Sequence, residues 1–328
     1  MRRFYTAISL LLLLALCGCS MRDLAGYPYV SQENGIPRSK LILAVPQEEW
    51  MMALGGQLSE IVSTHSEGAV DLQVTAVEDP MQLYQSGKAD MAFCSGEQIM
   101  GMDESLAYLS LPFLFQSPED YLTAVNEEDS PVRTSEAIRQ QTGGNILGVY
   151  YDCAWMLAAS KQASNAANPL YGLRIGTDNR FPFREVFLRL QAGDTASGNP
   201  KRMWQLFLQG EISTLEFLAE EADESLGEAE KIYYTRHRIE GRFLLLREGA
   251  VEEAVRLCLL QAFSETVEQA CRQRMEQEQT LVEGLCSEEA VKDADSGFAG
   301  LYEAAGSLYQ REGQSYGLSQ SQIAFFAF

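Results

Sequence analysis

The chain has 328 residues, of which 46% are hydrophobic and 22% charged, so it is long enough for two domains and for substantial buried cores. Its 25 basic and 46 acidic residues give a formal net charge of −21 at pH 7. This acidity argues against a nucleic-acid partner, because phosphate contacts need a patch of Lys and Arg, and against adsorption to anionic lipid headgroups.

The N-terminus has the organisation of a bacterial lipoprotein signal. Two arginines near the start precede residues 7–16 (AISLLLLLAL), an apolar stretch too short to span a bilayer. The letters L-C-G-C follow and resemble a lipobox, in which Gly18 precedes a lipidated Cys19. We therefore expect residues 1–18 to be a signal peptide and Cys19 to carry the acyl chains of a membrane anchor. A plain secretory signal is the alternative, but no A-x-A-like site follows.

Residues 19–38 are expected to form a tether, because they are polar and contain two glycines and two prolines. A regular pattern starts at Lys40. Apolar residues at helical spacing predict a helix over 48–66, and alternation predicts a strand over 69–77. Further strands are expected at 40–45, 89–95, 145–160, 172–177, 193–197, 212–217 and within 233–248. Further helices are expected at 80–87, at a segment that begins at Ser117, and at 181–193, 200–211 and 250–283. The βαβαβ order of the first unit predicts an α/β fold with a mostly parallel sheet, and the later segments predict a second α/β unit.

Little in the sequence indicates catalysis or a metal. His65 and His237 are the only histidines, and neither has a partner that a motif implies. Common nucleotide-binding, hydrolase and metalloprotease motifs are absent, so we expect neither an enzyme nor a cofactor. Five cysteines beyond the signal are scattered without metal-ligand spacing, and we expect small buried side chains, although the sequence leaves a disulfide open. They are Cys94, Cys153, Cys258, Cys271 and Cys286.

Several segments, in this order, resemble the extracytoplasmic solute-binding proteins of TRAP transporters, of the dicarboxylate- and sialic-acid-receptor type. These segments are SGKADMAF (86–93), LSLPFLFQSPEDY (109–121), YGLRIGT (171–177), MWQLFLQGEISTLE (203–216) and KIYYTRH (231–237). The resemblance runs from about Lys40 to about Tyr316, and LSLPFLFQSPEDY is its most specific part.

The resemblance implies a two-lobe periplasmic-binding-protein fold of type II-like architecture, with a long lobe-spanning helix. Lobe I would comprise 39–152 plus about 239–280, and lobe II 153–238 plus about 281–328. A small organic solute would bind in the cleft, and the lobes would close around it like a hinge. The receptor would pass the solute to a large and a small permease subunit, outside the cytoplasmic membrane of a bacterium, in uptake driven by an ion gradient.

Residues of the second lobe can be carried over one at a time. The family's carboxylate-binding arginine falls on Gly176, and Arg174 corresponds to the preceding lysine on the same strand face. Arg174 is thus a candidate ligand for an acidic solute, with a surface arginine as the alternative; Arg180 is a second candidate. A second arginine position of the family falls on Trp155.

The family's D-G-x-E-N segment becomes Ser213-Thr214-Leu215-Glu216-Phe217, which keeps only the glutamate. We therefore expect a pocket that is larger at Gly176 and more aromatic at Trp155 and Phe217, with Ser213 and Glu216 also lining it. Aromatic walls suit an apolar, ring-bearing or cationic ligand. The alternative is that the two rings fill the core between the lobes.

Polar residues that follow strands of the first lobe should also line the cleft, because open α/β sheets present ligands at strand ends. These are Glu48, Glu78, Ser95 and Glu97. An acidic pocket would favour an amine or a neutral solute over a dicarboxylate, unless these acids are rim residues in water.

Two other functions are open. The first keeps the fold without transport, as a solute-sensing or degenerate binding lipoprotein. The second, an enzyme, is the weakest, for want of a catalytic motif.

Overall fold

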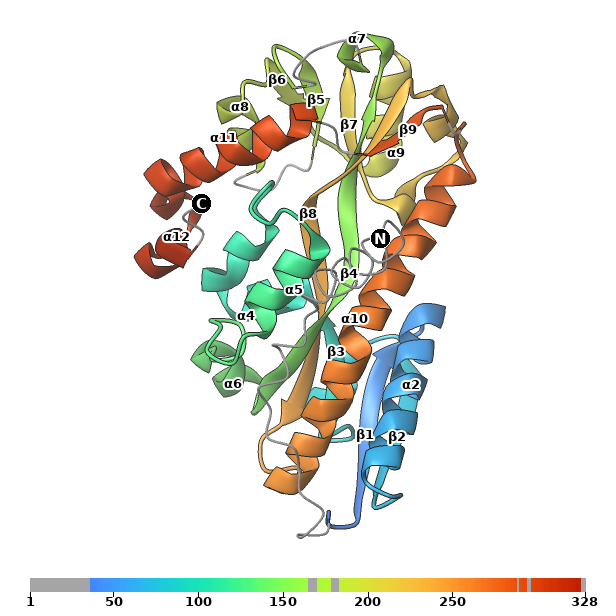
Figure 1. Cartoon of the computed structure of the whole chain (residues 1–328), viewed down its shortest axis with the longest axis vertical. Helices are drawn as coiled ribbons and strands as arrows, with labels where there is room; N and C mark the ends of the chain where they lie inside the picture. The colour runs from blue at the N-terminus through green and yellow to red at the C-terminus, as the bar shows by residue number, and fades with distance from the viewer. Residues whose placement is uncertain (1–35, 165–169, 178–182, 288, 294–295, 326–328) are drawn as a thin grey trace, which may run out of the picture.

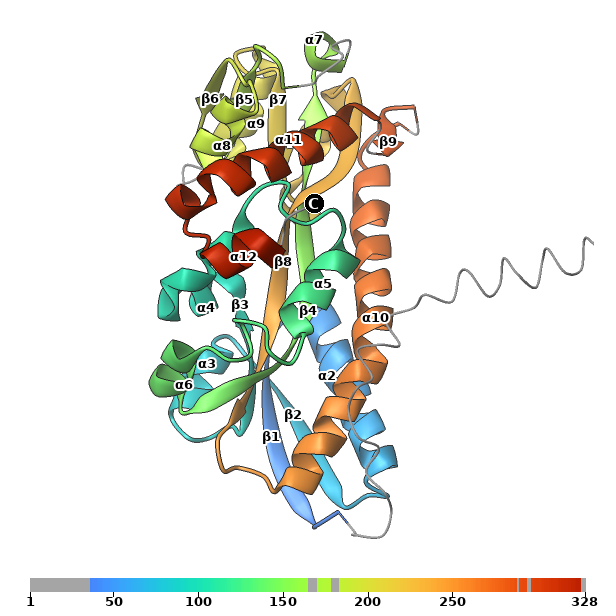
Figure 2. The same cartoon turned by 60° about the vertical axis from the view of Figure 1, so that its left-hand side comes forward.

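The computed structural model shows an elongated molecule with two lobes (Figures 1 and 2). It describes residues 36–164, 170–177, 183–287, 289–293 and 296–325. The lower lobe in Figure 1 carries the first three strands, and the upper lobe carries β5, β6 and β7. Two long strands and one long helix run between the lobes, so the expected two-lobe α/β architecture with a lobe-spanning helix is confirmed.

One sheet of nine strands extends through both lobes, in the order β2-β1-β3-β8-β4-β7-β5-β6, with β9 beside β8. Its two long members, β4 (Gly144–Ala159) and β8 (Lys231–Arg247), pair antiparallel along nearly their whole length. Three register shifts interrupt this pairing. The predicted parallel arrangement is confirmed for β1, β2 and β3. The sheet as a whole is mixed, because β8 returns antiparallel between β3 and β4 and so joins the two lobes in one sheet.

The first lobe forms as its hydrophobic periodicity indicates. Its strands are β1 (Ser39–Pro46), β2 (Val70–Val77) and β3 (Met91–Ser95), and its helices are α2 (Glu49–His65), α3 (Pro80–Gln85), α4 (Gly96–Met102), α5 (Pro118–Asn126) and α6 (Glu136–Thr142), with the 3-10 helix η2 (Glu104–Ser110). Helix α2 buries Leu54, Leu58 and Val62 against the sheet. Gly55 lets it approach closely, because a Cβ there would lie 2.9 Å from Val74 Cγ1.

The second lobe is built from short elements around a smaller core. They are α7 (Lys161–Ser164), β5 (Arg174–Gly176), α8 (Phe183–Arg189), β6 (Asp194–Ala196), α9 (Pro200–Leu208), β7 (Thr214–Phe217), η3 (Ala219–Glu221), η4 (Glu224–Glu228) and β9 (Val291–Asp293). Helix α9 begins at the Asn199 cap with Pro200 at its first position, and buries Trp204 and Phe207 against β7.

Helix α10 (Glu253–Glu283) has 31 residues and is about 46 Å long at 1.5 Å per residue. It packs on β4 and α2 along the length of the molecule (Figure 2). Its buried side includes the apolar Val255, Cys258 and Ala262 and also the charged Arg274 and Glu278. No helix in the described part of the chain combines the length and the apolar composition needed to cross a bilayer.

The C-terminal elements tie the lobes together and were not predicted. They are α11 (Ser296–Glu312), η5 (Gly313–Tyr316) and α12 (Gln320–Phe325). The Tyr302 hydroxyl donates to the Thr235 carbonyl of β8, and the Tyr309 hydroxyl to the Pro112 carbonyl, each over 2.6 Å. Because α11 contacts both β8 and the loop after η2, it lies across the junction of the two lobes.

Candidate functional site

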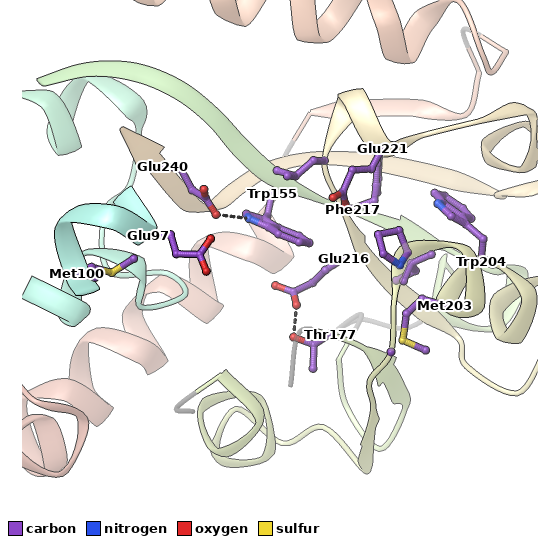
Figure 3. A pocket seen from close by; sticks show the side chains of 14 residues that line it. Glu97, Met100, Trp155, Thr177, Met203, Trp204, Glu216, Phe217, Glu221 and Glu240 are labelled. Carbon is purple, nitrogen blue, oxygen red and sulfur yellow. Dashed lines mark hydrogen bonds between the residues drawn. The ribbon is translucent and has the colours of Figure 1, made fainter. Parts of the chain in front are cut away.

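A cavity of about 320 Å³ lies between the lobes (Figure 3). Its walls come from α4 in the first lobe, from the long strands β4 and β8, and from β7, η3 and α9 with its preceding loop in the second lobe. The lining residues are Glu97, Met100, Trp155, Thr177, Gly198, Pro200, Met203, Trp204, Leu215, Glu216, Phe217, Leu218, Glu221 and Glu240. A ligand held here would contact both lobes at once.

Behind the cavity wall lies an arginine that sequence reasoning missed. Arg238 is 1% exposed and stands directly opposite Trp155 in the β4–β8 register. Its guanidinium carbon lies 4.0 Å from the ring centroids of both Trp155 and Phe183, so two aromatic faces enclose the charge. Its Nη1 atom is 3.7 Å from Glu216 Oε1. The wall of the cavity therefore contains a compensated, buried cation.

Glu216 is the centre of a buried hydrogen-bond network. His237 Nε2 lies 2.8 Å from Glu216 Oε1, and the Thr177 hydroxyl donates to Glu216 Oε2. Because a carboxylate only accepts, Nε2 of His237 carries the proton, and Nδ1 accepts from the Thr235 hydroxyl at 2.7 Å. This network explains why the glutamate and the histidine can both be fully buried without an unsatisfied carboxylate.

The charges of this network are fixed by their surroundings. Burial alone would raise the pKa of Glu216, but the charge of Arg238 and the hydrogen bonds from His237 and Thr177 lower it, so the carboxylate is ionised at neutral pH. Burial lowers the pKa of His237 and outweighs the opposing effect of Glu216, so the ring is neutral at neutral pH. Phe113 stacks on this ring with centroids 5.0 Å apart. The histidine thus has a structural role in this network.

Two further carboxylates face the open space of the cavity. Glu97 lies in the first turn of α4, where the positive end of the helix dipole favours a negative charge, and its side chain is exposed. Glu240 accepts a hydrogen bond from Trp155 Nε1 at 3.1 Å, which fixes the orientation of the indole. In Figure 3 the carboxylates of Glu97 and Glu216 are turned toward one another from opposite lobes.

Several solved structures share this architecture over most of the chain. A TRAP periplasmic solute-binding protein from Rhodobacter sphaeroides, in an apo open and partially disordered form, matches with a TM-score of 0.70 and 17% identity over 88% of this chain and 97% of that chain. A second TRAP periplasmic solute-binding protein, from Ochrobactrum anthropi, has its C-terminus bound in the ligand-binding pocket. It matches with a TM-score of 0.67 and 15% identity over 88% of this chain and 94% of that chain. A third, from Chromohalobacter salexigens with bound D-glucuronate, matches with a TM-score of 0.59 and 17% identity over 87% of this chain and 98% of that chain.

This chain has the fold of the TRAP solute-binding proteins. No protein family model matches it, and no curated protein resembles its sequence significantly. At identities of 15 to 17%, the shared architecture is what these matches show. The resemblance drawn from LSLPFLFQSPEDY and the other segments is therefore confirmed at the level of the fold.

Within this TRAP fold, the cavity brings together four of the residues expected to line it: Glu97, Trp155, Glu216 and Phe217. The sequence left open whether Trp155 and Phe217 line the pocket or fill the core, and the structure shows that Phe217 does both. Phe217 is 2% exposed and packs 5.7 Å from the Trp204 ring, as part of the second lobe's core, while still forming cavity wall. Trp155 is half-buried and separates Arg238 from the open space.

The structure places Arg174, Gly176 and Ser213 outside the lining of the cavity. Arg174 is exposed, and its Nε lies 3.3 Å from Asp194 Oδ2 on the neighbouring strand. No extra space exists at Gly176, because a Cβ there would lie 2.6 Å from Ile212 Cδ1. The Ser213 hydroxyl donates to Gln162 Oε1 at 3.4 Å. Thr177, one residue beyond Gly176, is the residue of this segment that lines the cavity; Arg180 lies outside the described residues.

The remaining candidates of the first lobe have other surroundings. Glu48 accepts hydrogen bonds from Arg242 Nη2 and Trp50 Nε1, each at 2.9 Å, and lines a separate opening of about 1030 Å³ between α2, η3 and α10. Ser95 caps α4, where its side chain and that of Gln98 form a capping box. Glu78 is exposed and lines none of the described cavities. Cys19 also lies outside the described residues.

The five cysteines of the described part of the chain are all free thiols. Four are buried and Cys286 is half-buried. The interpretation as small apolar side chains therefore holds for the four buried ones, and burial raises the pKa of the Cys258 thiol to about 11, which makes it unreactive.

Proposed function

We propose that this protein is an extracytoplasmic receptor of a TRAP transporter, which captures a small organic solute between its lobes and delivers it to the permease subunits. The observation that carries the proposal is the cavity itself. It is lined from both lobes of a fold whose solved examples are TRAP solute-binding proteins. One of those examples holds D-glucuronate, which supports a ligand of comparable size here.

The connections between the lobes suit a receptor that closes around its ligand. Only β4, β8, α10 and the C-terminal helix α11 pass between the lobes in the described part of the chain. A ligand that contacts Glu97 on one side and Glu216 on the other would favour a closed arrangement, because it gains contacts with both lobes only when they approach. The permease can then recognise the closed form.

We further propose that Cys19 carries a lipid anchor, as the lipobox-like segment suggests. The tether 19–38 would hold the lobes away from a membrane surface that a chain of net charge −21 does not bind by itself. The anchor would keep the receptor near its permease.

A cavity-filling variant tests the receptor function. Gly198 lines the cavity, and a Cβ there would make ordinary contacts, 3.5 Å from Arg202 Cγ, so Gly198→Trp should fold and obstruct the site. Gly56→Trp, on the exposed side of α2 with open space around its Cβ, is the matched control.

The assay combines a thermal-shift screen of the purified protein against organic acids, sugar acids, amines and neutral sugars with solute uptake by cells. We expect a ligand that stabilises wild type and Gly56→Trp but not Gly198→Trp, and loss of uptake of that solute in cells that carry Gly198→Trp. Ligand binding with unimpaired uptake would instead identify a sensing receptor. The absence of any cavity-dependent ligand would refute the proposal.

A further inference from the structure

Among the described residues, the lining of the inter-lobe cavity is rich in carboxylates. Four lining residues are glutamates, namely Glu97, Glu216, Glu221 and Glu240, and no lysine, arginine or histidine is among the described residues that line it. The rest of the lining is apolar or aromatic, with Trp155, Trp204 and Phe217 as its rings. A carboxylate ligand entering this space would meet like charges at short range, which disfavours its binding.

Arg238, a described arginine behind the cavity wall, does not offset this charge. Arg238 is 99% buried behind Trp155, and its guanidinium lies between the rings of Trp155 and Phe183. Its charge is balanced by the ionised Glu216 at 3.7 Å. With His237 neutral, this group of three has no net positive charge to offer a ligand.

Of the other three lining carboxylates, Glu97 and Glu240 face the open space from different parts of the molecule. Glu97 lies on α4 of the first lobe, and Glu240 lies on β8 where the lobes meet. Within the described part of the chain, the shortest ion-pair distance to either of them is the 3.9 Å between Glu240 Oε1 and Arg238 Nη2. No group of three His, Cys, Asp or Glu in the described part of the chain is positioned to hold a metal ion, so the expected cation is organic.

We propose that the solute bound in this cavity is an organic cation, an amine or quaternary ammonium compound with an apolar portion. The ammonium group would lie near Glu97 and Glu240, and its apolar part would contact Phe217, Trp204 and the exposed surface of Trp155. The inference specifies the ligand class of the proposed receptor, and it rests on that proposed function.

Probes that differ only in charge test this inference. A series of amines, from ethanolamine to 2-phenylethylamine, is titrated calorimetrically into the full-length protein, together with the alcohol and the carboxylate of each skeleton. We expect the tightest binder to be an amine that binds at least tenfold more tightly than its carboxylate partner. Its affinity should fall as salt is added, because the attraction is electrostatic.

A charge-removing variant locates the contact. Glu97 is exposed on the cavity wall, so Glu97→Gln should fold normally and weaken amine binding about fivefold or more, while the matched alcohol changes less than twofold. Glu60→Gln, an exposed glutamate on α2 away from the cavity, is the control.

The outcomes separate this inference from the function on which it rests. Tighter binding of the carboxylates, binding of neutral solutes alone, or amine binding unchanged in Glu97→Gln would overturn the cationic assignment while leaving the receptor function intact. If no solute of any class bound in the cavity, the receptor function itself would fail.

Discussion

The carboxylate of Glu216 should be one of the most costly side chains to neutralise in this protein. It is fully buried, and its Oε1 lies 3.7 Å from Nη1 of the buried Arg238 guanidinium. Glu240, at 3.9 Å, is part-exposed and can compensate only partly. Glu216→Gln keeps the size of the side chain and the hydrogen bond from Thr177 or His237, but it removes a buried negative charge from beside the guanidinium.

The expected cost follows from the burial. Removing one partner of a buried ion pair typically destabilises a protein by about 3–5 kcal/mol. At roughly 2 °C per kcal/mol for a chain of this size, the melting temperature of Glu216→Gln should be about 6–10 °C lower. Urea denaturation at pH 7, followed by circular dichroism, measures the difference directly. Glu211→Gln, an exposed glutamate three residues before β7, is the control and should lie within about 0.5 kcal/mol of wild type.

The pH dependence provides a second check on the same side chain. The pKa of Glu216 is lowered in the folded protein, so its stabilising contribution is present above the ordinary glutamate range and is lost as the pH falls through the folded value. The gap between wild type and Glu216→Gln should therefore be constant between pH 6 and 8 and narrow below about pH 4. A variant as stable as Glu211→Gln at pH 7 would refute the assignment of Glu216 as the essential counter-charge of Arg238.

Three further predictions concern the anchor and the junction of the lobes. Cys19→Ser should move the protein from the membrane fraction to the soluble fraction, and continued sedimentation with membranes would contradict lipidation at this cysteine. Burial disfavours the ionised form of Glu278 and raises its pKa to about 7. Glu278→Gln should therefore be more stable than wild type at pH 8, by up to roughly 3 kcal/mol, and no more stable at pH 5. A stability difference that does not depend on pH would contradict this. Glu220 of η3 contacts Arg274 of α10. Glu220→Gln should therefore change the distance distribution between spin labels placed at the exposed Met52 and Leu208, whereas the control Glu276→Gln should not. Identical distributions in wild type and Glu220→Gln would exclude a role for this contact in the arrangement of the lobes.

Most elements of the first lobe could be predicted from the sequence, because local periodicity determines them, whereas the two-lobe arrangement was implied by the family resemblance. Helix α2 is an example, since Leu54, Leu58 and Val62 recur at the helical spacing that its burial requires. The short elements α4 and α6 and the C-terminal α11 were not predicted. Helix α4 depends on a capping box at Ser95 rather than on a long apolar stripe, so its signal is brief.

The wall of the site could be predicted only in part, because the register between two distant strands decides it. Trp155 and Arg238 are 83 residues apart, and they face each other only through pairing that contains three register shifts. Nothing local in YYTRHR distinguishes Arg238 from Arg236. The burial of Arg274 on α10 is equally invisible in the sequence, since it contacts Asp152 and Glu220, which are remote in the sequence.

The unbroken sheet has a mechanical consequence. Since β4 and β8 remain hydrogen-bonded to each other from one lobe to the other, any closure has to flex this ribbon and not slide one body over another. Bending this pair of strands costs free energy and favours the unbent arrangement. Part of the free energy of ligand contacts therefore offsets the cost of bending. Substitutions that soften the ribbon at its irregular pairs, between Tyr151 and Cys153 or between Trp155 and Leu157, would then tighten capture and slow release without touching the solute.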